Sequence, residues 1–123
     1  MLLDLLGTPN PRFPNFFQST SHWHNDLVAI ESTLRNGRMW SGNHRGRTFF
    51  RSEPSYGGVE DDHVPFLQRS VDVVHIISAP FPSVWHKPED NKSALDFPTI
   101  DNLNRILRVF VARYLHLPGL MRV

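Results

Sequence analysis

One stretch of the sequence decides the fold class: residues 71–78, which read Val-Asp-Val-Val-His-Ile-Ile-Ser. Its β-branched residues predict a strand that is buried on both faces, as strands of parallel sheets usually are. A second apolar run, from Leu2 to Leu6, predicts another short buried strand, which Gly7 and the prolines after it bring to an end. The chain between these two runs must then supply the helices that cover a parallel sheet.

Two segments have the spacing of amphipathic helices. From about His22 to Arg35, apolar residues recur every three or four positions, and Asn36-Gly37 is a plausible stop. A longer helix is predicted to have Thr99 as its N-cap and to end at Pro118-Gly119. The apolar face of this helix comprises Ile100, Leu103, Leu107, Phe110, Val111 and Tyr114. With a short strand predicted at residues 48–50 and a short helix after residue 62, the order of elements is typical of an α/β protein with a largely parallel sheet.

Each of the two main strands carries one polar residue among apolar ones, Asp4 in the first and His75 in the second. A carboxylate in a central strand is costly unless it is paired or protonated. A buried histidine needs a hydrogen-bond partner, and we expect a carboxylate at an adjacent strand end to be the partner of His75. For either residue alone, a satisfied structural network is the default interpretation. Together they favour one shared polar centre.

An acidic pair, Asp61-Asp62, precedes the predicted short helix. Because neighbouring side chains point in different directions, the two acids are not expected to share a proton. We expect Asp62 to cap the helix, which leaves Asp61 free to face the site. His63 has two interpretations, a metal-site residue in an Asp-x-His-like pattern or, as the favoured alternative, an ordinary residue of the first helical turn.

Phe81, Trp85 and His86 lie in a proline-rich loop that follows the second strand. Ligands of open α/β sheets gather outside the carboxyl ends of the strands, which makes this loop a candidate site. His86 is a candidate zinc ligand, although a single loop histidine is more often a surface residue, and a catalytic zinc needs about three protein ligands. Phe81 and Trp85 are either simple loop anchors or the walls of a small apolar pocket.

The composition narrows the function classes. The chain has 123 residues, a formal net charge of +1 and no block of one charge sign, so the sequence does not have the basic surface of a nucleic-acid-binding protein. It has no cysteine, which excludes a disulfide or a thiolate metal site within the chain. No apolar run is long enough to span a membrane, and no targeting signal is expected from Met1 to Leu6.

These segments together resemble the glutaminyl-peptide cyclotransferases, which share the zinc aminopeptidase-like fold of the M28 peptidase clan. The resemblance is carried by LLDLLG with PNP at residues 2–11, FPNFF at 13–17, YGGV at 56–59, DDHVPFL at 61–67, VHII at 74–77, PFP with VWH at 80–86, and DNL at 101–103. It implies a three-layer α/β fold with a mostly parallel mixed sheet flanked by helices. It also implies that residues 1–123 are the C-terminal part of a single catalytic domain.

The family converts the N-terminal glutamine of peptides to pyroglutamate and releases ammonia. The resemblance implies that His86 is one zinc ligand, with the other ligands outside this chain, and that Asp4, Asp61 and His75 belong to the catalytic proton network. It implies that Phe81 and Trp85 line the substrate pocket, and Glu60 is expected at a substrate contact. The parent enzyme is expected to be secreted, with a Golgi membrane-anchored enzyme as the alternative.

Two other interpretations stay open. One is that the chain belongs to an M28-type zinc aminopeptidase, although a tryptophan beside the ligand histidine suits a closed cyclase pocket better than an open cleft with two metal ions. The other is that the chain is a non-catalytic piece that associates with a partner through exposed apolar faces. With one zinc ligand and few strands, the chain alone is predicted to be inactive.

Overall fold

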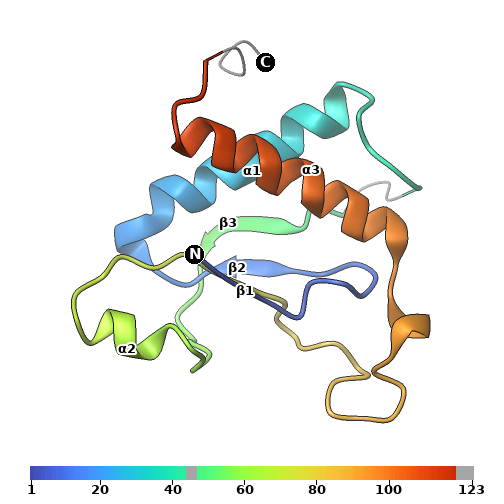
Figure 1. Cartoon of the computed structure of the whole chain (residues 1–123), viewed down its shortest axis with the longest axis horizontal. Helices are drawn as coiled ribbons and strands as arrows, with labels where there is room; N and C mark the ends of the chain where they lie inside the picture. Colours follow the sequence, from blue (N-terminus) through green and yellow to red (C-terminus); the bar gives the residue numbers. More distant parts are fainter. Residues whose placement is uncertain (44–46, 119–123) are drawn as a thin grey trace.

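A computed structural model describes residues 1–43 and 47–118 and has the predicted α/β architecture (Figure 1). The helices are α1 (Ser21–Asn36), α2 (Val64–Leu67) and α3 (Phe97–Tyr114), with short 3-10 helices at Gln18–Thr20 and Lys92–Ala94. The strands are β1 (Leu2–Asp4), β2 (Phe13–Asn15), β3 (Phe50–Pro54) and β4 (His75–Ile77). Each predicted element therefore has a counterpart, although the strand expected at residues 48–50 runs from Phe50 to Pro54, and β2 is a further strand that was not predicted.

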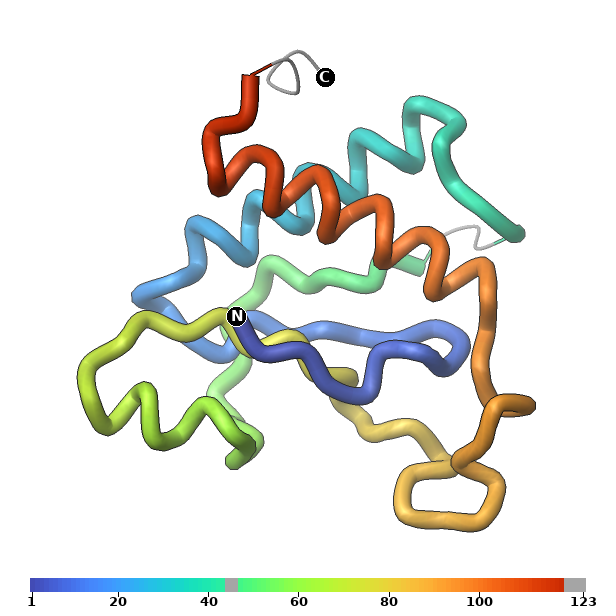
Figure 2. Tube along the Cα trace, viewed as in Figure 1, coloured from blue at the N-terminus to red at the C-terminus, as the bar shows by residue number. Residues whose placement is uncertain are grey.

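The strands form two parallel pairs. Strand β1 pairs with β4, and Leu2 lies opposite His75, although the two residues are far apart in the sequence. Strand β2 pairs with β3 in the same parallel sense, and β2 also packs beside β4. The blue N-terminal segment therefore runs beside the yellow segment around residue 75 (Figure 2). This pairing confirms the parallel sheet that the two apolar runs predicted.

Strand β1 is less buried than predicted. Leu3 is 44% exposed and Asp4 is also exposed, because β1 pairs only with β4 among the described residues. The Asp4 carboxylate accepts a hydrogen bond from the backbone N–H of Leu5 at 2.9 Å. The expectation of a carboxylate buried in a central strand was therefore wrong for Asp4 in this structure.

The long helices begin and end close to the predicted residues, with one correction. Helix α1 stops at Gly37, whose N–H donates to the Thr33 carbonyl. Helix α3 has Asp96 as its N-cap, because the Asp96 carboxylate accepts hydrogen bonds from the Thr99 N–H at 3.0 Å and the Thr99 hydroxyl at 2.6 Å. The predicted cap, Thr99, is thus the residue that is capped. Of the predicted Pro118-Gly119 stop, Gly119 lies outside the described residues, and the helix already ends at Tyr114.

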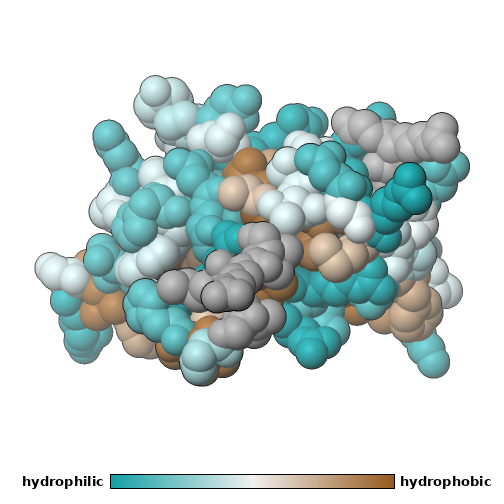
Figure 3. Space-filling view, turned by 90° about the horizontal axis from the view of Figure 1, so that it is seen from above, coloured by the Kyte–Doolittle hydropathy of each residue, from teal (hydrophilic) through white to brown (hydrophobic). Residues whose placement is uncertain are grey.

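The core lies between the helices and the strands, with α1 and α3 packed together over the sheet (Figure 1). Leu103, Ile106 and Phe110 of α3 are each at most 5% exposed. Their spacing of three and four places them on one face of the helix. Val111 was predicted on this face, but it is 47% exposed because it follows Phe110 by one residue, which turns it about 100° away. Seen from above, the outer surface is mainly hydrophilic, with smaller hydrophobic areas (Figure 3).

A buried carboxylate joins α1 to the start of β3. Glu31 is 1% exposed, and its two carboxylate oxygens accept hydrogen bonds from the N–H groups of Phe49 and Phe50 at 2.8–3.1 Å. Arg35 donates to the same carboxylate from one turn further along the helix, at 2.8 Å. Glu31 therefore holds the aromatic start of β3 against α1, which no apolar pattern in the sequence indicates.

Candidate active site

The centre of the candidate site is a hydrogen bond between Asp61 and His75. Strand β4 places His75 in the interior, where the residue is 2% exposed. Its Nε2 lies 2.9 Å from Oδ2 of Asp61, whose side chain is 19% exposed and belongs to the loop before α2. The expectation that a carboxylate is the hydrogen-bond partner of His75 is confirmed for Nε2, whereas the buried Nδ1 has no partner among the described residues. The carboxylate comes from this loop and not from the neighbouring strand.

The environment of Asp61 keeps its carboxyl group ionised. The N–H of Asp62 donates to Asp61 Oδ1 at 2.8 Å, and this hydrogen bond is the main reason why the pKa of Asp61 lies below its usual value. Partial burial opposes this shift, and the hydrogen bond and charge of His75 add to it. An ionised carboxylate can only accept hydrogen bonds, so the hydrogen of the Asp61–His75 contact is on Nε2 of His75. The geometry therefore fixes one orientation and one tautomer of the imidazole.

The acidic pair is arranged differently from the prediction in one respect. His63, not Asp62, occupies the N-cap position of α2, and no side chain caps this helix. The carbonyl of Asp61 instead accepts the N–H of Val64 at 3.1 Å. Asp62 remains an exposed residue whose backbone N–H supports the Asp61 carboxylate.

His63 is the site residue that sequence reasoning underestimated. It is 5% exposed, and its ring centroid lies 4.4 Å from that of His75 and 5.6 Å from that of Phe17. Burial first, and then the neighbouring His75, lower the pKa of His63, while Asp61 raises it. One signal in the sequence is the position of His63, since it directly follows the acidic pair.

The loop after β4 places its aromatic residues as a separate cluster. The rings of Phe81 and Trp85 meet edge to face at 4.9 Å, and Trp85 stacks on His86 at 3.7 Å. Trp85 is 40% exposed and His86 is also exposed. His86 has a φ of 57°, a left-handed conformation that is uncommon for residues other than glycine and that clusters at functional sites.

The predicted site residues are only partly brought together. Asp61 and His75 are in direct contact, whereas no hydrogen bond or ring contact among the described residues joins His86 to either of them. Asp4 lies on the strand next to His75 but is exposed, and Glu60 is exposed beside Asp61. The Asp61–His75 pair is therefore formed within this chain, while no hydrogen bond or ring contact among the described residues joins the loop with His86 to it.

The described residues do not form a metal site by themselves. Within residues 1–43 and 47–118, no group of three or more histidine and acidic side chains is arranged to hold a metal ion. A zinc site requires about three protein ligands, so the described residues do not fit a complete zinc centre. His86, with its exposed imidazole, fits one corner of such a centre at most.

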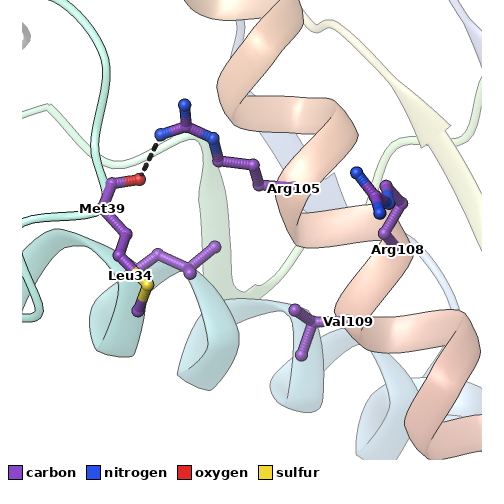
Figure 4. A pocket seen from close by; sticks show the side chains of 5 residues that line it. All are labelled: Leu34, Met39, Arg105, Arg108 and Val109. Carbon is purple, nitrogen blue, oxygen red and sulfur yellow. Dashed lines mark hydrogen bonds between the residues drawn. The ribbon is translucent and has the colours of Figure 1, made fainter. Parts of the chain in front are cut away.

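A separate groove of about 470 Å³ lies between α1 and α3 (Figure 4). Leu34, Met39 and Val109 supply its apolar lining, and Arg105 and Arg108 lie beside them on α3. The Arg105 guanidinium donates to the Met39 carbonyl at 2.6 Å, which ties α3 to the loop that follows α1. None of the predicted site residues lines this groove, so we assign it no part in the candidate site.

No helix in the described part of the chain is both long and apolar enough to cross a bilayer. Parallel strands beneath paired helices define an α/β fold, and a carboxylate and an imidazole are joined beside the sheet. The sequence pattern of Peptidase family M28 matches residues 1–111, and the chain belongs to that family.

Within this family, the chain is similar to glutaminyl-peptide cyclotransferases, as its motifs predicted. It is 54% identical over 118 residues to the glutaminyl-peptide cyclotransferase of Bos taurus, and the aligned region covers 95% of this chain and 32% of that protein. It is 41% identical to the glutaminyl-peptide cyclotransferase of Drosophila melanogaster, over 94% of this chain and 35% of that protein. The chain thus spans about a third of the length of these relatives.

Solved structures support the same fold. The glutaminyl cyclase of Macrostomum lignano matches with a TM-score of 0.89 and 37% identity, over 96% of this chain and 39% of that one. A leucine aminopeptidase precursor from Bacteroides thetaiotaomicron matches with a TM-score of 0.63 at 22% identity, over 86% of this chain and 34% of that one, which shows a shared fold alone.

Proposed function

We propose that this chain is the part of a glutaminyl-peptide cyclotransferase that carries the Asp61–His75 pair of the active site. Such an enzyme converts the N-terminal glutamine of a peptide to pyroglutamate and releases ammonia. The single observation that carries the proposal is the 2.9 Å hydrogen bond between Asp61 and His75. It lies in a chain that is 54% identical to a bovine protein of that name.

The reaction requires one bond to form, one to break and one proton to move. The α-amine of glutamine attacks the carbon of its own γ-carboxamide, and because both groups belong to one residue, their effective concentration is high. The bond to the amide nitrogen then breaks, and this nitrogen leaves as ammonia with the proton that the attacking amine gives up. A positioned carboxyl group carries this proton between the two nitrogens. We assign Asp61, held by His75, to the network that supports the transfer.

The remaining site residues have proposed roles in binding. Phe81 and Trp85 form an edge-to-face pair that offers an apolar wall for the side chain of glutamine. Glu60, which directly precedes Asp61, contacts the substrate. Asp4 belongs to the acidic network. Its carboxylate is exposed here, and residues from outside the described part of the chain would have to cover it.

We also propose that the enzyme is zinc-dependent and that His86 supplies one ligand. A zinc ion would polarise the carbonyl under attack. Because the described residues contain no further ligand set, we assign no step of the reaction to the metal within this chain. For the same reason, the isolated chain is expected to be inactive. The complete enzyme is expected to be secreted, with Golgi anchoring as the alternative.

A chimaeric enzyme tests the proposal. The matching third of the bovine cyclotransferase is replaced by this chain, and cyclisation of a peptide with N-terminal glutamine is measured with added zinc, together with hydrolysis of leucine amide. We expect cyclisation without hydrolysis of leucine amide. Loss of cyclisation in a correctly folded chimaera, or hydrolysis of leucine amide in its place, would contradict the proposal.

Variants of the chimaera test the roles of the residues. Asp61→Asn is expected to lower kcat about a hundredfold or more, in line with the usual contribution of proton transfer. Asp90→Asn is the matched control, because Asp90 is an exposed acid in the same loop as His86 and takes part only in a backbone turn. Equal activity of the two variants would refute the role of Asp61.

A further inference from the structure

We propose that His63 is a positioning residue for the Asp61–His75 pair. The uncharged ring of His63 packs against His75 and keeps the His75 imidazole directed at Asp61. The inference rests on the proposed function only in so far as that function gives the pair its purpose. The arrangement of the three side chains is a property of the structure by itself.

The first argument is geometric. The hydrogen bond to Asp61 holds the imidazole of His75 at Nε2 alone, and packed ring neighbours add to the restraint that keeps the ring from turning about its bond to Cβ. Among the described residues, the rings of His63 and Phe16 are such neighbours of His75, at 4.4 Å and 5.8 Å between ring centroids. The closer one, His63, is itself held by an edge contact with Phe17 at 5.6 Å. Packed rings from the residues that directly follow β2 thus adjoin the hydrogen-bonded pair.

The second argument concerns charge. Two imidazolium rings with centroids 4.4 Å apart would repel each other strongly in the interior. His63 is the ring without a carboxylate partner among the described residues, because Asp61 binds His75. The other charged groups near His63 line the adjoining pocket and are Asp62, Asp72 and the N-terminal residue Met1. Burial first, and then the neighbouring His75, lower the pKa of His63, while the Asp61 carboxylate opposes them; the pKa stays below its usual value, which keeps the ring uncharged near neutral pH.

The third argument concerns the unused nitrogen. Nδ1 of His63 is buried and has no hydrogen-bond partner among the described residues. A buried polar atom without a partner destabilises the fold, so structural packing alone would favour a phenylalanine at this position. His63→Phe therefore keeps the ring and removes an unsatisfied atom, and it is expected to fold. His63→Ala removes the ring.

The test is NMR of the ¹⁵N-labelled chain, which follows the hydrogen-bonded Nε2 proton of His75. The signal is assigned by its absence in His75→Gln. In His63→Ala we expect exchange of this proton with water to be faster, on the order of tenfold, while His63→Phe keeps it within about twofold of the wild type. His22→Ala, which removes an exposed histidine that packs on Trp23, is the control and should change nothing.

The pH profile separates positioning from general packing. In the wild type, acidification charges His63 and should release the pair, whereas in His63→Phe the signal should persist to lower pH, until Asp61 is protonated. Circular dichroism checks folding, and His63→Leu replaces His63→Ala should the latter unfold. Unchanged exchange without the ring, or identical acid midpoints of the wild type and His63→Phe, would overturn the proposal. Because no activity is measured, failure of the cyclase assignment would be seen separately, in the chimaera.

Discussion

Glu31 offers a sharp test of how the fold is held together, because one buried carboxylate serves two strand amides. Glu31→Ala removes the acceptor of the Phe49 and Phe50 N–H groups and the ion partner of Arg35. Loss of a buried hydrogen-bond acceptor costs about 1–3 kcal/mol for each donor left behind. With two amides affected, we expect the free energy of unfolding to fall by roughly 2–6 kcal/mol, a large share of the stability of a small domain.

The assay is urea denaturation of the isolated chain, followed by far-UV circular dichroism. Glu53→Ala is the matched control, because Glu53 is an exposed acid on β3, the strand that Glu31 holds. The control is expected to change the free energy of unfolding by less than about 0.5 kcal/mol. A loss below about 1 kcal/mol for Glu31→Ala would show that water or other groups replace the carboxylate, and the reasoning would fail.

Two further predictions concern pH and packing. Burial lowers the pKa values of His24 and His63 from 6.5. Below pH 6.5 the folded chain therefore binds fewer protons than the unfolded chain, and the stability present above pH 6.5 should be lost as the pH falls through the folded pKa values. Urea midpoints measured from pH 7.5 downward check this, and a midpoint that stays constant to pH 5 would contradict it. Ile106→Ala should destabilise the chain by about 2–5 kcal/mol, and the exposed Val111→Ala on the same helix by less than about 0.5 kcal/mol. Equal losses would show that the buried face of α3 is assigned wrongly.

The regular elements could be predicted because each depends on local spacing. The apolar runs that contain Leu3 and Ile76 indicated the β1–β4 pair, and the stripe that contains Leu27 indicated α1. The N-cap of α3 was misplaced because both Asp96 and Thr99 are good capping residues. Which of them lies outside the helix depends on Pro98, which the first turn of a helix tolerates. The role of Glu31 was not predictable, since its partners are backbone amides 18 and 19 residues away.

The candidate site was predictable where a physical requirement acted on one residue. A histidine among apolar residues demands a hydrogen-bond partner, and this requirement led from His75 to a carboxylate. No such requirement identified His63, because a histidine at the start of a short helix is equally well placed in water. Its burial follows from Phe17 and His75, which the fold brings to it from other parts of the sequence.

The two halves of the proposed site differ in what this chain provides by itself. Asp61, His75 and His63 are fixed by hydrogen bonds and ring contacts within the described residues. Trp85 and His86 mainly contact each other and Phe81, and both are exposed. Substitutions in the first group should therefore change spectroscopic signals of the isolated chain, whereas substitutions in the second group should have consequences only in an enzyme with a complete active site. The role of His86 is thus a question for the chimaera, and the role of His63 is a question for the chain alone.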